Sequence, residues 1–85
     1  MAENKTVYLM KSITPKEGVL RNVHMRILDR ECTIERTYPN AVFSYIKRDG
    51  SPNFMYTSYI QNITEEDGKL IIETNNTVYE LEAIE

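Results

Sequence analysis

Cysteine, histidine, glycine and tryptophan are scarce in this chain of 85 residues. It has one cysteine, one histidine, three glycines and no tryptophan. One cysteine excludes an intrachain disulfide, and three scattered glycines exclude a glycine-rich phosphate loop. Cys32 and His24 cannot supply the four ligands of a structural zinc site. We therefore expect no metal, no cofactor and no enzyme activity, although a Cys32–His24 nucleophile pair stays formally open.

Long apolar runs are absent as well. No segment approaches the roughly 20 apolar residues that a membrane-spanning helix needs. Residues 1–10 contain one lysine but neither an apolar core nor a small-residue cleavage site, so we expect no signal peptide. With a single cysteine, which we expect to be a small core residue, a reducing cytoplasm is the predicted compartment.

What is present is typical of one small β-domain. Hydrophobic residues make up 41% and charged residues 27% of the chain, as in ordinary soluble domains. Turn signals recur at short intervals, and the segments between them alternate polar and apolar residues. We predict a single all-β domain over residues 1–85. It should have six or seven short antiparallel strands in a small barrel or sandwich, SH3-like or related.

The C-terminal part contains the clearest hairpin. Two alternating runs flank the asparagines at 75–76, a residue type that tolerates the positive φ of a two-residue type I′ turn. That loop places Leu70 opposite Leu81 and Ile72 opposite Tyr79 on one apolar face. Pattern and register agree, which favours this hairpin strongly.

The middle of the chain predicts a second hairpin. The Asp-Gly dipeptide at 49–50 is a strong signal for a two-residue turn. With that loop, Tyr45 lies opposite Phe54 and Phe43 lies opposite Tyr56. We expect this aromatic ladder to form part of the core.

The strand at residues 54–60 has large apolar side chains on both faces. Phe54 and Tyr56 alternate with Met55 and Tyr59, whereas a half-buried strand normally has one polar face. A domain of this size is expected to leave one of these faces uncovered. We therefore predict a dimer or higher closed oligomer.

Residues 14–28 fit two structures. Thr14 followed by Pro15 and Glu17 is typical of a helix start, and Val19, Val23 and Ile27 recur at helical spacing. The same region alternates like a strand at Val23, Met25 and Ile27. We predict a turn and then a strand, with one short helical turn after Thr14 and His24 on the strand's solvent side. A helix over residues 19–28 is the alternative.

Tyrosine is the unusual residue, with six in the chain. Tyrosines anchor interfaces and also stack on nucleic-acid bases. The tyrosines of the middle region are accompanied by arginines near strand ends. We therefore predict a ligand-binding site formed by Arg36, Tyr38, Arg48, Tyr56 and Tyr59, the alternative being that the tyrosines belong to the core and the arginines to a solvated edge.

Charge is unevenly distributed, although the net charge is only −3. Residues 1–63 hold nine basic and six acidic side chains, whereas residues 64–85 hold one basic and seven acidic ones. Such asymmetry marks either two opposed binding surfaces or simply the charged outer face of a hairpin. The net negative charge argues against a dedicated nucleic-acid-binding domain.

The stretch YTSYIQNITEEDGKLIIETNNTVYELE, Tyr56 to Glu82, resembles the C-terminal half of small β-rich proteins of phages and mobile elements from Gram-positive and gut bacteria. That family has no assigned catalytic residues. The resemblance implies a non-enzymatic binding protein in the cytoplasm of a bacterial host. It would inhibit host defence by sequestering a small signalling nucleotide or occluding a host protein. A virion assembly module and a nucleic-acid-binding small β-barrel are the alternatives.

Overall fold

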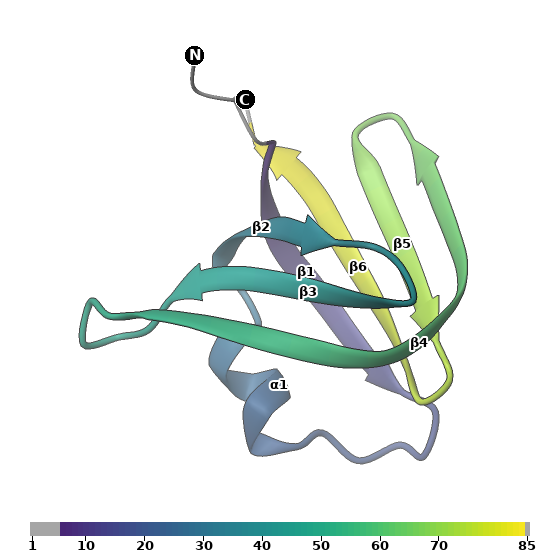
Figure 1. Cartoon of the computed structure of the whole chain (residues 1–85), viewed down its shortest axis with the longest axis horizontal. Helices are drawn as coiled ribbons and strands as arrows, with labels where there is room; N and C mark the ends of the chain where they lie inside the picture. The colour runs from purple at the N-terminus through teal and green to yellow at the C-terminus, as the bar shows by residue number, and fades with distance from the viewer. Residues whose placement is uncertain (1–5, 85) are drawn as a thin grey trace.

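The computed structural model describes residues 6–84 as a closed barrel of six antiparallel strands with one short helix (Figure 1). Each strand pairs with the next along the chain, and β6 closes the barrel against β1. The elements are β1 (Val7–Pro15), α1 (Asn22–Ile27), β2 (Glu31–Arg36), β3 (Asn40–Ile46), β4 (Pro52–Glu66), β5 (Lys69–Thr74) and β6 (Thr77–Ile84). The predicted all-β barrel is confirmed.

The core fills the inside of the barrel. Phe43 from β3 and Tyr79 from β6 meet there, with ring centroids 5.5 Å apart. The buried apolar cluster draws on all six strands and on the helix; it comprises Met10, Ile13, Ile27, Cys32, Ala41, Phe43, Tyr45, Met55, Leu70, Ile72, Tyr79 and Leu81. One face of each strand therefore points inward, which leaves the outer faces as the surface on which a site can lie.

The β5–β6 hairpin has the predicted register. Leu70 pairs with Leu81 and Ile72 with Tyr79, and all four side chains are buried. The predicted turn chemistry is wrong, however. Within residues 6–84 the non-glycine residues with positive φ are Asp29 and Asp67. The asparagines at 75–76 therefore do not form a type I′ turn, which requires positive φ at both central residues.

The β3–β4 hairpin differs from the prediction by one residue. Its loop contains three residues, because the Lys47 N–H donates to the Ser51 carbonyl at 2.8 Å and the Gly50 N–H donates to the Lys47 carbonyl at 2.9 Å. Gly50 has a φ of +89°, the left-handed conformation that a three-residue hairpin loop requires. The predicted two-residue Asp-Gly turn is therefore wrong.

The shift of one residue reverses the two faces of β4. Tyr45 pairs with Asn53, whose amide donates to the Tyr45 hydroxyl at 2.8 Å. Met55 now points into the core and is 2% exposed, whereas Phe54 and Tyr56 are 52% and 67% exposed. The predicted aromatic ladder across Tyr45–Phe54 is wrong, since side chains alternate with a period of two and a slip by one inverts every position.

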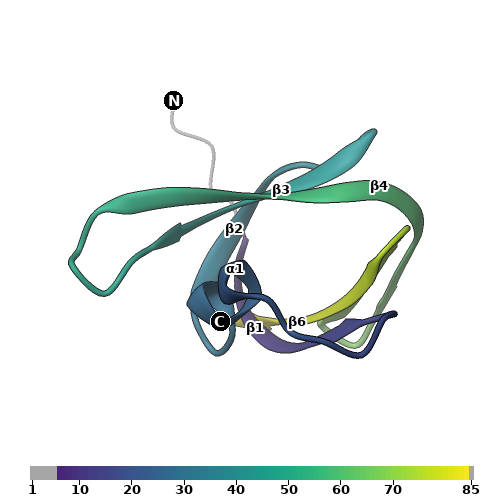
Figure 2. The ribbon, with the colours of Figure 1, turned by 90° about the horizontal axis from the view of Figure 1, so that it is seen from below.

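Residues 22–27 form helix α1 rather than the predicted strand. In a closed barrel every strand edge is already paired, so no edge is left for a further strand at this position. Ile27 and His24 are buried, and the helix packs beside the barrel below β3 and β4 (Figures 1 and 2). Thr14 lies in β1, and a single turn follows it, in which the Gly18 N–H donates to the Pro15 carbonyl at 2.9 Å.

Strand β4 is the longest element, and its 15 residues pair first with β3 and then with β5. The pairing with β3 is interrupted between Asn40 and Val42, whose partners are Tyr59 and Tyr56. Two residues of β4 therefore face one residue of β3, which is a β-bulge. The extra residue changes the alternation, so that Tyr56 and Tyr59 both point outward.

Candidate functional site

Four of the five predicted site residues lie together on the outer surface of β2, β3 and β4. Arg36 pairs with Val42 and Val42 pairs with Tyr56, which places the arginine and the tyrosine on the same side of the sheet. Tyr59 follows beyond the bulge, 63% exposed. We define the aromatic face as Arg36, Tyr38, Phe54, Tyr56 and Tyr59.

A network of polar contacts holds the bulge that shapes this face. The Arg36 guanidinium donates to the Asn40 side-chain oxygen, and the Asn40 amide donates to the Thr57 carbonyl at 3.1 Å. The Thr57 hydroxyl accepts the Ala41 N–H at 2.9 Å. These side chains satisfy backbone groups that the bulge removes from the ladder, so the outward direction of the tyrosines is built into the fold.

The loop between β2 and β3 extends the aromatic face. It carries Tyr38, the most exposed of the large side chains at 83%. The Ile60 N–H donates to the Pro39 carbonyl at 2.9 Å, which fastens this loop to β4 next to Tyr59. The aromatic face therefore consists of three exposed tyrosines and Phe54 around a single cation.

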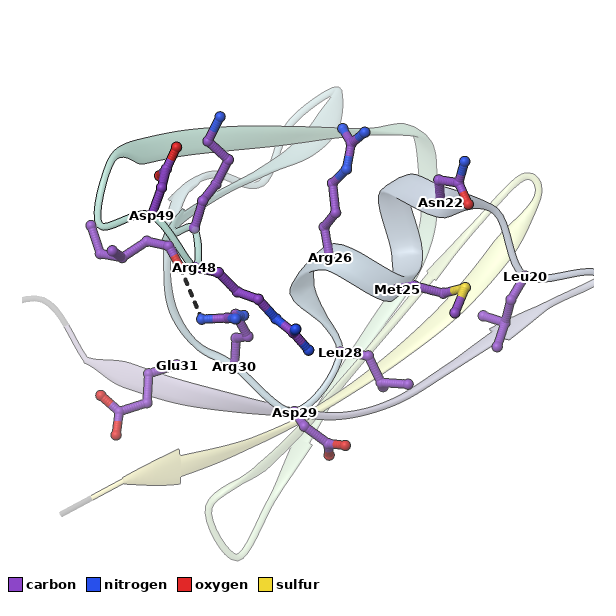
Figure 3. A pocket seen from close by; sticks show the side chains of 12 residues that line it. Leu20, Asn22, Met25, Arg26, Leu28, Asp29, Arg30, Glu31, Arg48 and Asp49 are labelled. Atoms are coloured by element: carbon purple, nitrogen blue, oxygen red, sulfur yellow. Dashed lines mark hydrogen bonds between the residues drawn. The ribbon is translucent and has the colours of Figure 1, made fainter.

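The fifth predicted residue, Arg48, lies elsewhere. It projects from the β3–β4 loop into a groove between that loop, α1 and the start of β2 (Figure 3). This hairpin groove has a volume of about 1230 Å³. Its four cations are Arg26, Arg30, Lys47 and Arg48.

The structure therefore separates the two predicted arginines. Arg36 is level with Val42 of β3, and Arg48 lies beyond the end of that strand at Ile46. Four residues of strand span roughly 13 Å. The predicted site that combines Arg36 with Arg48 is therefore divided between two parts of the surface.

Cys32 and His24 do not form an activated nucleophile. Cys32 is buried, as predicted, and burial raises the pKa of its thiol to about 12, which disfavours the reactive thiolate. His24 is also buried, so its predicted place on the surface of a strand is wrong.

His24 has a structural role in α1. Its Nδ1 accepts the Arg21 N–H at 3.2 Å, and its ring meets the edge of Tyr79 with centroids 6.2 Å apart. Burial, followed by the positive charge of Arg21, lowers the pKa of His24. The histidine is therefore held neutral between the helix and β6.

Residues 6–84 contain neither a metal-binding cluster nor a helix that could span a membrane. In this range no group of three or more histidine, cysteine or acidic side chains is arranged to hold a metal ion. None of the helical structure in the described part of the chain has the length and apolar character that a bilayer crossing needs.

Sequence reasoning missed the hairpin groove and the residues of α1 that line it. Arg26 and Arg30 were not singled out, because the groove exists only once α1 lies against the β3–β4 loop. The exposure of Phe54 was missed for a related reason, since it depends on a one-residue choice of register.

Comparisons with known proteins add no relative. No protein-family model, curated protein or solved structure matched the chain.

Proposed function

We propose that this chain is a non-enzymatic binding protein that covers a surface of another protein with its aromatic face. The observation that carries this proposal is the outward direction of Tyr56 and Tyr59, which a bulge and its hydrogen bonds impose. Tyrosine and arginine are enriched where protein interfaces are energetically strongest. Tyrosine supplies contact area with few rotatable bonds to immobilise.

The charge of the aromatic face favours a protein partner over a nucleotide. A nucleotide or single strand needs cations beside its stacked bases to neutralise phosphate. The face has one guanidinium, Arg36, and that group already donates to Asn40. Arg48, the other predicted phosphate contact, lies in the separate hairpin groove.

In the phage setting that the resemblance implies, this protein partner is a component of host defence, occluded in the host cytoplasm. The Cys32 thiol is buried with its pKa raised to about 12, so this side chain is suited to the core and not to nucleophilic attack. A virion subunit as partner would make the chain an assembly module instead.

The test uses a photo-crosslinking amino acid in place of Phe54, at the edge of the aromatic face. In extracts of a bacterial host we expect one saturable protein crosslink, which we would identify by mass spectrometry. The variant Tyr56→Ser/Tyr59→Ser should bind the purified partner at least about 30-fold more weakly, because two central anchors each contribute roughly 1–2 kcal/mol.

The matched control is Ile84→Ser, which removes an exposed apolar side chain at the end of β6, outside the aromatic face. It should bind the partner like the wild type. Crosslinks found only to nucleic acid, or equal binding by the tyrosine variant and the control, would overturn the proposal.

A further inference from the structure

Two ends of the molecule carry charged side chains of opposite sign that make no ion pair within residues 6–84. The ion pairs found within residues 6–84 join β1 or the loop after it to the β5–β6 hairpin. They are Lys11–Glu82 at 3.8 Å and Lys16–Glu73 at 2.8 Å. The cations of the hairpin groove make no ion pair in this part of the chain. The same holds for the acids of the β4–β5 turn, which are Glu65, Glu66 and Asp67.

The groove and the turn lie at opposite ends of the molecule. The β3–β4 loop projects at the left of Figure 1 and the β4–β5 turn lies at the upper right, along a longest dimension of 40 Å. The same separation is seen in the view of Figure 2. One chain therefore cannot bring its own groove and its own turn together.

The groove concentrates positive charge at its centre. Figure 3 shows the guanidinium groups of Arg30 and Arg48 pointing into it, with the carboxylates of Asp29 and Glu31 directed outward at the rim. Arg30 is held in place, since its Nη1 donates to the Ile46 carbonyl at 3.3 Å. Two cations that converge without a carboxylate between them are stabilised when an anionic group enters.

The third carboxylate at the rim, that of Asp49, already has partners. It accepts the Ser51 N–H at 2.9 Å and the Ser51 hydroxyl at 2.6 Å, and these bonds lower its pKa. It is therefore occupied within its own loop.

The groove also offers exposed apolar side chains. Leu20, Met25 and Ile46 are 42%, 63% and 53% exposed along it. No aromatic side chain lines the groove, so it lacks the stacking surface that a nucleic acid uses. Its complement is a polypeptide segment that combines carboxylates with aliphatic side chains.

The β4–β5 turn has this composition. Its three consecutive acids are flanked by Ile63 and Ile71, each 40% exposed. The turn is narrow, because Asp67 and Gly68 both have positive φ, at 53° and 79°. We define the acidic tip as residues 63–71.

We propose that the acidic tip of one copy enters the hairpin groove of a second copy, head to tail. Every copy added to such a contact presents a free groove at one end and a free tip at the other. The assembly is then a ring if the rotation between copies closes, and a filament if it does not. In this contact the positively charged part of one copy binds the negatively charged part of the next copy.

The test uses two charge-reversal variants and light scattering. The groove variant is Arg26→Glu/Arg48→Glu, and the tip variant is Glu65→Lys/Glu66→Lys. The wild-type mass should rise above the 10.0 kDa of one chain as concentration increases, and should fall as salt screens the contact. Each variant alone should remain a single chain.

Mixing the two variants gives the sharpest outcome. The groove variant still has an intact tip, and the tip variant still has an intact groove. An equimolar mixture should therefore assemble through the intact tip and the intact groove, although each variant alone does not.

The control Lys11→Glu/Lys16→Glu introduces the same change of charge as the groove variant, but outside both surfaces. It removes two exposed ion pairs, and such pairs contribute little to stability. It should assemble like the wild type, and circular dichroism should give all variants the wild-type spectrum. The proposal is overturned if the wild type stays a single chain at millimolar concentration, or if the mixture stays dissociated. It is also overturned if Tyr56→Ser/Tyr59→Ser abolishes assembly, since the copies then meet through the aromatic face.

Discussion

The β5–β6 and β3–β4 hairpins both have turn signals in the sequence but are specified by different forces. In β5–β6 the predicted register is right although the predicted turn is wrong. In β3–β4 a turn signal led to a register that is wrong by one residue. The comparison shows that strand pattern determined one register and loop geometry the other.

The β5–β6 register is fixed by burial. A slip of β6 by one residue would expose Tyr79 and Leu81 and bury Glu80. The loop is then held by side chains rather than by a special backbone conformation. The Thr74 hydroxyl donates to the Thr77 carbonyl at 2.9 Å and accepts the Thr77 N–H at 3.1 Å.

The β3–β4 register is not fixed by burial alone. Phe54 and Met55 are both large and apolar, so either could face the core. The choice falls to the loop, where Gly50 takes the left-handed conformation, and to Tyr45, whose hydroxyl accepts the Asn53 amide. Met55 is buried as a consequence.

The largest predicted effect tests which aromatic side chains form the core. Phe43→Ala should destabilise the fold by about 3–5 kcal/mol, because a fully buried ring in contact with Tyr79 is removed. Phe54→Ala should cost less than about 1 kcal/mol, because that ring is half exposed. Urea denaturation measures both. Equal losses for the two variants would mean that the β3–β4 register is the one predicted from the Asp-Gly dipeptide.

A smaller effect is predicted for the two loops. Gly50→Ala should cost about 1–2 kcal/mol through its positive φ alone, since an added Cβ meets no atom within 4 Å. Asn76→Ala should change stability by no more than about 0.5 kcal/mol, because position 76 lacks positive φ. Thermal unfolding of both variants checks this. A cost at Asn76 that matches the cost at Gly50 would show that backbone conformation governs both hairpins.

The smallest predicted effect is a dependence of stability on pH, which arises where α1 packs on β6. The pKa of His24 is lowered in the folded protein, so the unfolded chain binds the proton more tightly. Stability should therefore decrease as pH falls below about 6.5, the ordinary value for histidine. Amide exchange near Tyr79, which contacts His24, should accelerate more than exchange in β3. A His24→Gln variant should lose this dependence between pH 7.5 and 5.5, and a slope that persists in the variant would assign it to other groups.

The residues of the predicted site fall into two groups in the structure. The grouping of Arg36, Tyr38, Tyr56 and Tyr59 was predicted from their shared region of sequence, and the outer face of β2–β4 brings them together. Arg48 was predicted with them, but its loop turns away from that face and its side chain lies in the hairpin groove. Composition can indicate which residue types form a surface, but it does not show toward which side of a loop a side chain points.

The sequence by itself determined the all-β class and the register of β5–β6, since the alternation of apolar and polar side chains acts between neighbouring residues. Tertiary structure alone decided the conformation of residues 22–27 and the inward face of β4. Closing the barrel uses every strand edge, which leaves α1 as the structure that can bury Ile27 and His24. The hairpin groove also depends on tertiary structure, because it forms between α1, the start of β2 and the β3–β4 loop.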